Sequence, residues 1–271
     1  MKPELADLFF AATAACYLGA SVLFIAFLAG YLKAMPRWAP RLVAIGVPLH
    51  ATHIVLWSLV LHVCPVEGIH FALSVASMLG CLLYVLARTR WHIDVVGAFV
   101  APQALTFLLA SRLVGQVDSA PHLKSALLPF HVISNLLGIA LFTLASAAAL
   151  GYLVQERRLK QKRLVGMFKR LPAVDALDQA EHRFLVAGFP LLTIGILTGT
   201  LWAHELAGGG FVGIARAALS YASWALIGGV LLLRAAAGWR GRRAALGTIV
   251  GFGLTLLVLL IYLVRSMTVP A

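Results

Sequence analysis

Eight long apolar runs dominate this chain of 271 residues and decide what it can fold into. Each run is close to or longer than the roughly 20 residues that a helix needs to cross the hydrocarbon core of a bilayer. The runs cover residues 8–31, 42–63, 69–87, 93–113, 127–154, 184–203, 212–233 and 244–264. The sequence therefore predicts an all-α polytopic membrane protein with about eight transmembrane helices.

The composition agrees with this interpretation. Apolar residues make up 61% of the chain and charged residues 12%, whereas soluble domains carry about 45–50% and about 25%. We expect residues 1–271 to form a single transmembrane domain. The longest polar stretch, residues 155–183, is predicted to be an amphipathic segment on the cytoplasmic membrane surface.

The basic residues that give the chain its net charge of +12 are concentrated on one side of this predicted topology. Of the 22 Lys and Arg residues, 17 fall in the connections after the first, third, fifth and seventh spans, and 5 fall on the opposite side. Basic connections stay in the cytoplasm, so both termini are predicted to lie outside. The charge is explained by topology and by contact with anionic membrane lipid, and we expect no nucleic-acid partner.

Nine histidines are many for so apolar a sequence. Polar side chains inside a span are costly and point to function, and His50 and His53 share one face of the second predicted span. Five more are expected at or near the outer surface, namely His62, His70, His122, His131 and His204. Imidazoles from several spans favour paired ligands to haem iron or a zinc or copper site, and their spacing does not distinguish these.

Sequence motifs of common enzymes are absent. The chain has no G-x-S-x-G, P-loop, H-E-x-x-H or G-x-G-x-x-G motif. Its cysteines, Cys16, Cys64 and Cys81, form no C-x-x-C pair of the kind that attaches haem covalently. The few acidic residues near the spans are predicted to lie at span ends, as at Asp94 and Glu205. We therefore expect a protein that binds or moves a ligand and is not an enzyme.

Two adjacent segments carry a specific family resemblance. Residues 170–183 read RLPAVDALDQAEHR, and residues 188–203 read GFPLLTIGILTGTLWA. They resemble the CcsA/HemX group of membrane-bound cytochrome c assembly proteins, which typically reads R-L-P-S-L-E-x-L-D-x-x-x-Y-R and then G-F-P-L-L-T-x-G-x-x-T-G-x-x-W-A. Three further blocks are similar, at residues 130–138, 66–74 and 238–252. The resemblance covers about residues 66–265.

The resemblance implies a haem-binding or haem-handling membrane protein that acts in cytochrome c assembly in the bacterial cytoplasmic (inner) membrane. The implied cofactor is non-covalent haem b. His131 matches the family's external haem-ligand histidine, and His70 matches a histidine of its transmembrane haem site. His50 and His204 complete the set of candidate cofactor-binding residues.

Departures from the family pattern point to the HemX-like branch. The motif W-G-x-Y-W-x-W-D is absent between the sixth and seventh predicted spans, Leu232 stands where the family has a second transmembrane histidine, and L-H-S-Y-G is missing. The alternative function is a HemX-type regulator of tetrapyrrole biosynthesis that acts on the level of glutamyl-tRNA reductase. The expected partner is therefore a cytochrome c assembly protein or that reductase, at the cytoplasmic face. A non-haem metal transporter is the third interpretation.

Overall fold

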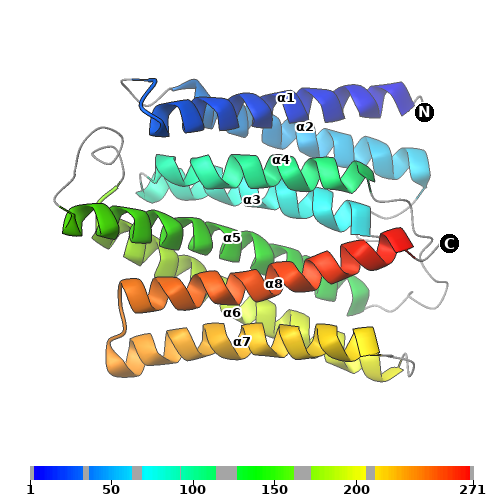
Figure 1. Ribbon diagram of the computed structural model, residues 1–271. Helices are drawn as coiled ribbons and strands as arrows, with labels where there is room; N and C mark the ends of the chain where they lie inside the picture. The colour runs from blue at the N-terminus through cyan, green and yellow to red at the C-terminus, as the bar shows by residue number, and fades with distance from the viewer. Residues whose placement is uncertain are drawn as a thin grey trace.

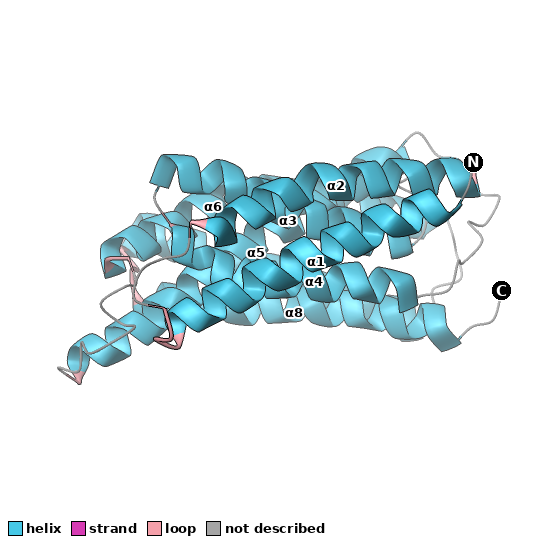
Figure 2. Cartoon of the chain, turned by 90° about the horizontal axis from the view of Figure 1, so that it is seen from above, coloured by secondary structure: helices cyan, strands magenta, loops and turns pink. Residues whose placement is uncertain are grey.

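The computed structural model is entirely helical in the residues that it describes (Figures 1 and 2). These are residues 3–32, 37–62, 69–91, 93–113, 127–161, 172–205 and 211–268. The helices are α1 (Pro3–Leu28), α2 (Trp38–Leu61), α3 (Ile69–Trp91), α4 (Gly97–Leu113), α5 (Leu127–Lys160), α6 (Val174–Glu205), α7 (Phe211–Ala237) and α8 (Arg242–Thr268). Seven are long and apolar enough to cross a membrane, and α4 is a shorter apolar helix. The predicted polytopic, all-α membrane fold is confirmed.

Large apolar side chains cover the outside of the helices. Exposed examples are Val22 of α1 (57%), Leu59 of α2 (56%) and Val250 of α8 (54%). In water such a continuous apolar surface would drive aggregation, whereas lipid solvates it. The exposure pattern therefore fits a multi-pass membrane protein.

The fourth span differs from its prediction. It was expected to begin at residue 93, but a 3-10 turn, η1 (Asp94–Val96), precedes α4. The Arg88 side chain donates to Asp94 Oδ1 over 2.7 Å, and the Tyr84 hydroxyl donates to the Asp94 carbonyl over 2.8 Å. A Cβ at Gly97 would lie 2.4 Å from the Phe24 ring. These contacts fix the turn against α3 and let α4 start close to α1.

The predicted amphipathic segment, residues 155–183, divides between two helices in its described parts. Residues 155–160 continue α5, and α6 begins at Val174, whereas the sixth span was expected to begin at residue 184. Residues 162–171 lie outside the described part of the chain. The early start of α6 brings Asp178 and Glu181 into the bundle, where both are buried. Both lie within the first eight residues of α6, near one end of that span.

The helices form two groups that meet along α3 and α5. In the N-terminal group, α1 packs on α2 and α4, and α3 packs on α2 and α4. In the C-terminal group, α5 packs extensively on α6 and also on α8, and α7 packs on α8 and α6. Figure 1 shows the bundle running from α1 and α2 at one edge to α7 at the other, with the free ends of α1 and α8 at the same end. We call this the outer end, following the predicted topology, and the opposite one the inner end.

Candidate functional site

His70 lies in the first turn of α3 and has no hydrogen-bond partner in the described structure. The residue is only 8% exposed, and both of its ring nitrogens are buried without a partner. Its ring lies beside that of Phe71, with the centroids 4.4 Å apart. A buried polar group without a partner is costly. A ligand bound to a His70 ring nitrogen would therefore supply a partner that this buried nitrogen lacks among the described residues.

His50, on α2, is completely buried and uses both ring nitrogens. Nδ1 lies 3.2 Å from the Tyr17 hydroxyl of α1, and Nε2 lies 2.9 Å from the Ser74 hydroxyl of α3. A ligand role for His50 would require one of these hydrogen bonds to break.

His53 lies one turn farther along α2 and is held by α1. Its Nδ1 donates to the Ala6 carbonyl over 2.9 Å, and its ring lies edge-on to Phe10 and stacks on Trp57. The Arg112 guanidinium, from the end of α4, lies 4.5 Å from the Trp57 ring centroid. Contacts around His53 thus join α1, α2 and α4 of the N-terminal group.

His131 lies in the second turn of α5 and faces α6. Its Nδ1 lies 3.1 Å from the hydroxyl of Thr198, which itself donates to the Ile194 carbonyl over 2.7 Å. The ring is therefore held between α5 and α6 by hydrogen bonds. The Asn135 amide lies 3.3 and 3.4 Å from the two ring nitrogens.

Glycines of α6 make room for His131. A Cβ at Gly199 would lie 2.8 Å from His131 Cε1, and a Cβ at Gly195 would lie 2.4 Å from Asn135 Oδ1. Real Cβ atoms do not approach so closely, so any other residue here would displace the side chain of His131 or Asn135. These glycines of the GFPLLTIGILTGTLWA segment therefore bring α5 and its histidine against α6.

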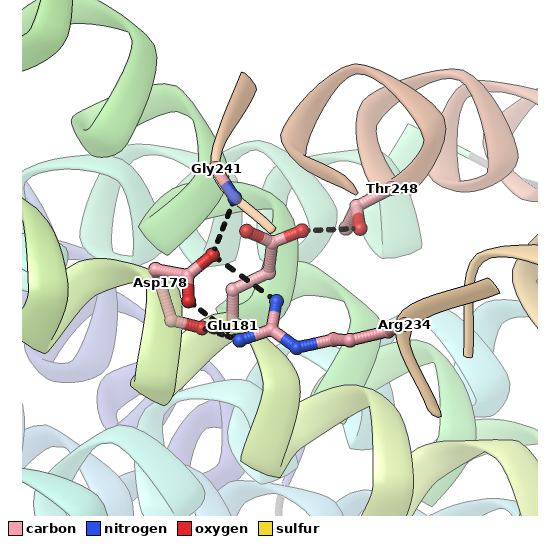
Figure 3. Close-up of polar contacts among 5 residues, drawn as sticks. All are labelled: Asp178, Glu181, Arg234, Gly241 and Thr248. Atoms are coloured by element: carbon pink, nitrogen blue, oxygen red, sulfur yellow. Dashed lines mark hydrogen bonds and ion pairs between the residues drawn. The ribbon is translucent and has the colours of Figure 1, made fainter. Parts of the chain in front are cut away.

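A buried polar network joins α6, α7 and α8 at the inner end (Figure 3). Asp178 Oδ2 accepts from Arg234 Nη2 over 2.6 Å, and Asp178 Oδ1 accepts from Arg234 Nη1 over 3.1 Å. The backbone N–H of Gly241, between α7 and α8, donates to the same Oδ1 over 2.9 Å. Gly241 has a φ of +66°, a left-handed conformation that favours glycine. One carboxylate thus holds the turn between α7 and α8 in place.

Glu181 lies beside this ion pair, one turn along α6, and is completely buried. Its Oε1 accepts from the Thr248 hydroxyl of α8 over 2.6 Å, and its Oε2 has no partner among the described residues (Figure 3). The network therefore contains two acidic side chains and one arginine in its core.

Comparison with known proteins shows the family to which this chain belongs. The sequence profile described as "Cytochrome C assembly protein" matches residues 48–269, which is most of the chain. The chain belongs to the cytochrome c assembly protein family. The predicted family resemblance is confirmed, and the assignment to the HemX-like branch stays a prediction.

Several curated proteins align along much of the chain. The "Cytochrome c biogenesis protein CcsA" of Parasynechococcus marenigrum (strain WH8102) is 26% identical over 214 residues, covering 69% of this chain and 70% of the relative. The protein of the same name from Chlamydomonas reinhardtii is 27% identical over 198 residues, covering 69% and 55%. An "Uncharacterized 28.8 kDa protein in nifR3-like 5'region" of Azospirillum brasilense is 29% identical over 216 residues, covering 74% and 73%.

Three separate sequence blocks that carry the predicted resemblance meet at the inner polar network. Asp178 comes from RLPAVDALDQAEHR, Arg234 follows the run of leucines at residues 231–233 of α7, and Gly241 belongs to GWRGR. Leu232, where the resemblance predicts a histidine, is 67% exposed on α7. In this chain, these blocks therefore supply a network that joins helix ends.

The predicted site residues separate into two places. His50 and His70 lie in the N-terminal group, while His131 lies in the C-terminal group. The side chain of His204 falls outside the part of the chain that is described. Their roles toward a cofactor stay predictions. Sequence reasoning missed Tyr17 and Asn135, although Asn135, four residues after His131, could have been found from helical periodicity.

Proposed function

We propose that the protein binds haem b non-covalently and handles it for cytochrome c assembly in the bacterial cytoplasmic membrane. Membership of the cytochrome c assembly family supports the pathway. The observation that carries the haem assignment is His70, with both nitrogens buried and unpartnered at the outer end of α3.

The donor set fits haem iron. When bound, haem would supply an iron that takes an imidazole nitrogen as axial ligand, and one His70 nitrogen would then gain a partner. His131, which matches the external haem-ligand histidine of the predicted family resemblance, is the second proposed ligand residue. His50 and His204 stay further candidates, although His50 must first release Tyr17 or Ser74.

The test is an absorption spectrum of the detergent-purified protein after haem-replete expression. We expect a Soret band that His70→Ala or His131→Ala reduces strongly. His62→Ala serves as the matched control, because this histidine lies just after α2, is exposed and has no ligand role in the proposal. A wild-type protein without bound haem, or equal Soret loss in all three variants, would overturn the proposal.

The proposed partner is a cytochrome c assembly protein. The alternative partner, glutamyl-tRNA reductase at the cytoplasmic face, belongs to the regulatory interpretation. Deletion of the gene separates the two, since our proposal requires loss of cytochrome c with unchanged reductase abundance. Changed reductase abundance with normal cytochrome c would favour the regulator, and a stoichiometric non-haem metal in the purified protein would favour the transporter.

A further inference from the structure

The Glu181 carboxyl is buried in the inner polar network without a cation of its own. Its exposure is 0%, Oε1 accepts one hydrogen bond from Thr248, and Oε2 has no partner among the described residues. Within the described part of the chain, no ion pair joins Glu181 to Lys, Arg or His. A carboxylate so poorly compensated is costly to bury, whereas the neutral acid loses far less on leaving water.

The nearby guanidinium of Arg234 is bound to Asp178 instead. Asp178 lies one turn before Glu181 on α6, and Figure 3 shows the Glu181 carboxyl between Asp178 and Thr248. The Asp178 carboxylate accepts three hydrogen bonds, two from Arg234 and one from the backbone N–H of Gly241. Arg234 also donates to the Asp178 carbonyl over 3.2 Å. Hydrogen bonds to the charged form stabilise it, so the negative charge belongs on Asp178 and a proton belongs on Glu181.

The groups on the surrounding helices agree with this assignment. Three charged or titratable side chains interact electrostatically with Glu181, namely Tyr152 of α5, Asp178 of α6 and Arg234 of α7. A tyrosine is neutral at neutral pH. The neighbouring helix α8 contributes the uncharged Thr248 hydroxyl, and its own arginines, Arg242 and Arg243, are exposed. One positive and one negative charge therefore already balance, and an ionised Glu181 would leave the buried network with a net charge of −1.

We propose that Glu181 is a proton-binding site, which holds a proton at neutral pH and whose deprotonation loosens α6 from α8. This inference does not depend on haem binding. In the protonated state, Oε2 carries the hydrogen and Oε1 keeps its hydrogen bond from Thr248. When hydroxide removes the proton as water, the new carboxylate repels Asp178 and competes with it for Arg234. Since Asp178 also holds the turn between α7 and α8 through Gly241, the whole inner joint is weakened.

The first test is infrared spectroscopy of the purified protein in a maltoside detergent, which has no carbonyl group. A protonated carboxyl has a C=O stretching band at higher frequency than a carboxylate. We expect this band in the wild type at neutral pH, its loss in Glu181→Gln and its retention in the matched control Asp175→Asn, which changes an exposed carboxyl of the same helix. A spectrum in which Glu181→Gln removes no such band overturns the inference.

Thr248→Val gives a second spectroscopic signature that does not require the Gln variant to fold. It removes the hydrogen bond to Oε1, so the protonated-carboxyl band should move to higher frequency without disappearing. The band of the wild type should also disappear as the pH is raised. A wild-type protein without a protonated-carboxyl band at neutral pH overturns the inference by itself.

The second test follows the melting temperature against pH. An unfolded chain has its glutamates ionised at neutral pH, so folding takes up a proton at Glu181 and the stability of the wild type falls as the pH rises. Glu181→Gln cannot lose this proton. The melting temperature of the wild type should therefore fall relative to that of Glu181→Gln by about 2–4 °C for each pH unit above neutrality, until the proton is lost.

The slope of this difference is the readout, because the histidines titrate alike in both proteins and the buried Gln amide changes stability at every pH. Asp175→Asn should follow the pH dependence of the wild type. Parallel curves for wild type and Glu181→Gln would show that the site binds no proton that matters to the fold, and they overturn the inference. The haem spectrum of the wild type is a separate measurement, so its failure would overturn the proposed function alone.

Discussion

Two regions of the molecule bury polar groups with different partners. One is the histidine cluster of α1–α3, formed by Tyr17, His50 and Ser74, and the other is the inner polar network of α6–α8. The cluster uses neutral side chains, with His50 bonded to two hydroxyls. The network uses formal charges, with Asp178 paired to Arg234. Ions cost most in the middle of a bilayer and less near its boundary. The comparison teaches that the charged residues join helix ends, whereas the neutral residues lie beside His70, a histidine without a hydrogen-bond partner among the described residues.

Removing the arginine should break the charged region most severely. Arg234→Leu leaves Asp178 as a buried, unpaired carboxylate, which costs about 3–5 kcal/mol. We expect a large fall in the melting temperature of the purified protein, measured by tryptophan fluorescence in detergent. The control is the double variant Asp178→Asn/Arg234→Leu, which should be more stable than Arg234→Leu because no buried charge remains alone. A double variant that melts below the single one would contradict the ion-pair account.

Thr248→Val should have the next largest effect. It removes the only hydrogen bond that Glu181 makes among the described residues, and an unsatisfied buried group costs about 1–3 kcal/mol. The control is Thr13→Val on α1, a completely buried threonine whose hydroxyl donates to the Phe9 carbonyl of its own helix. Thermal melting should rank Thr248→Val below this control, and the opposite ranking would place Glu181 outside the stabilising network.

His50→Leu tests the neutral region and should cost less than Arg234→Leu. The Tyr17 and Ser74 hydroxyls lose their His50 partner, but no charge is left unpaired, so we expect a loss of about 1–2 kcal/mol. The same melting assay measures it. A loss as large as that of Arg234→Leu would remove the distinction between the two regions.

Lys160→Ala should have the smallest effect. Lys160 pairs with Glu156 over 2.8 Å near the end of α5, but its side chain is 66% exposed. Exposed pairs at this helical spacing contribute about 0.3–0.5 kcal/mol. The melting temperature should barely move, and added salt should abolish any difference. A larger change would show that charge alone, without burial, stabilises the inner end.

The sequence predicts the spans well because each span is a local property. Twenty apolar residues in a row need a bilayer whatever lies beside them, and all eight helices appear close to their predicted places. The boundaries that were missed depend on contacts between helices. Residues 94–96 form a turn because Arg88 and Tyr84 bind Asp94, and a hydropathy pattern contains no such information.

The candidate site was predictable only in part, for the same reason. An unusual residue type identifies His50, His70 and His131. Their partners, Tyr17 and Ser74, look like ordinary core residues until α1, α2 and α3 are brought together. Likewise, nothing in the spacing of Asp178 and Arg234 indicates that they pair across α6 and α7.

The short helix α4 has a consequence for the surrounding membrane. Its 17 residues give a length of about 26 Å, whereas the hydrocarbon core is about 30 Å thick. A bilayer meets such a mismatch by thinning, and Leu109 on the outward face of α4 is exposed to it. Headgroups and water should therefore dip beside Arg112, at the end of α4. The protein would thus be sensitive to lipid chain length, with longer acyl chains straining this one flank of the bundle.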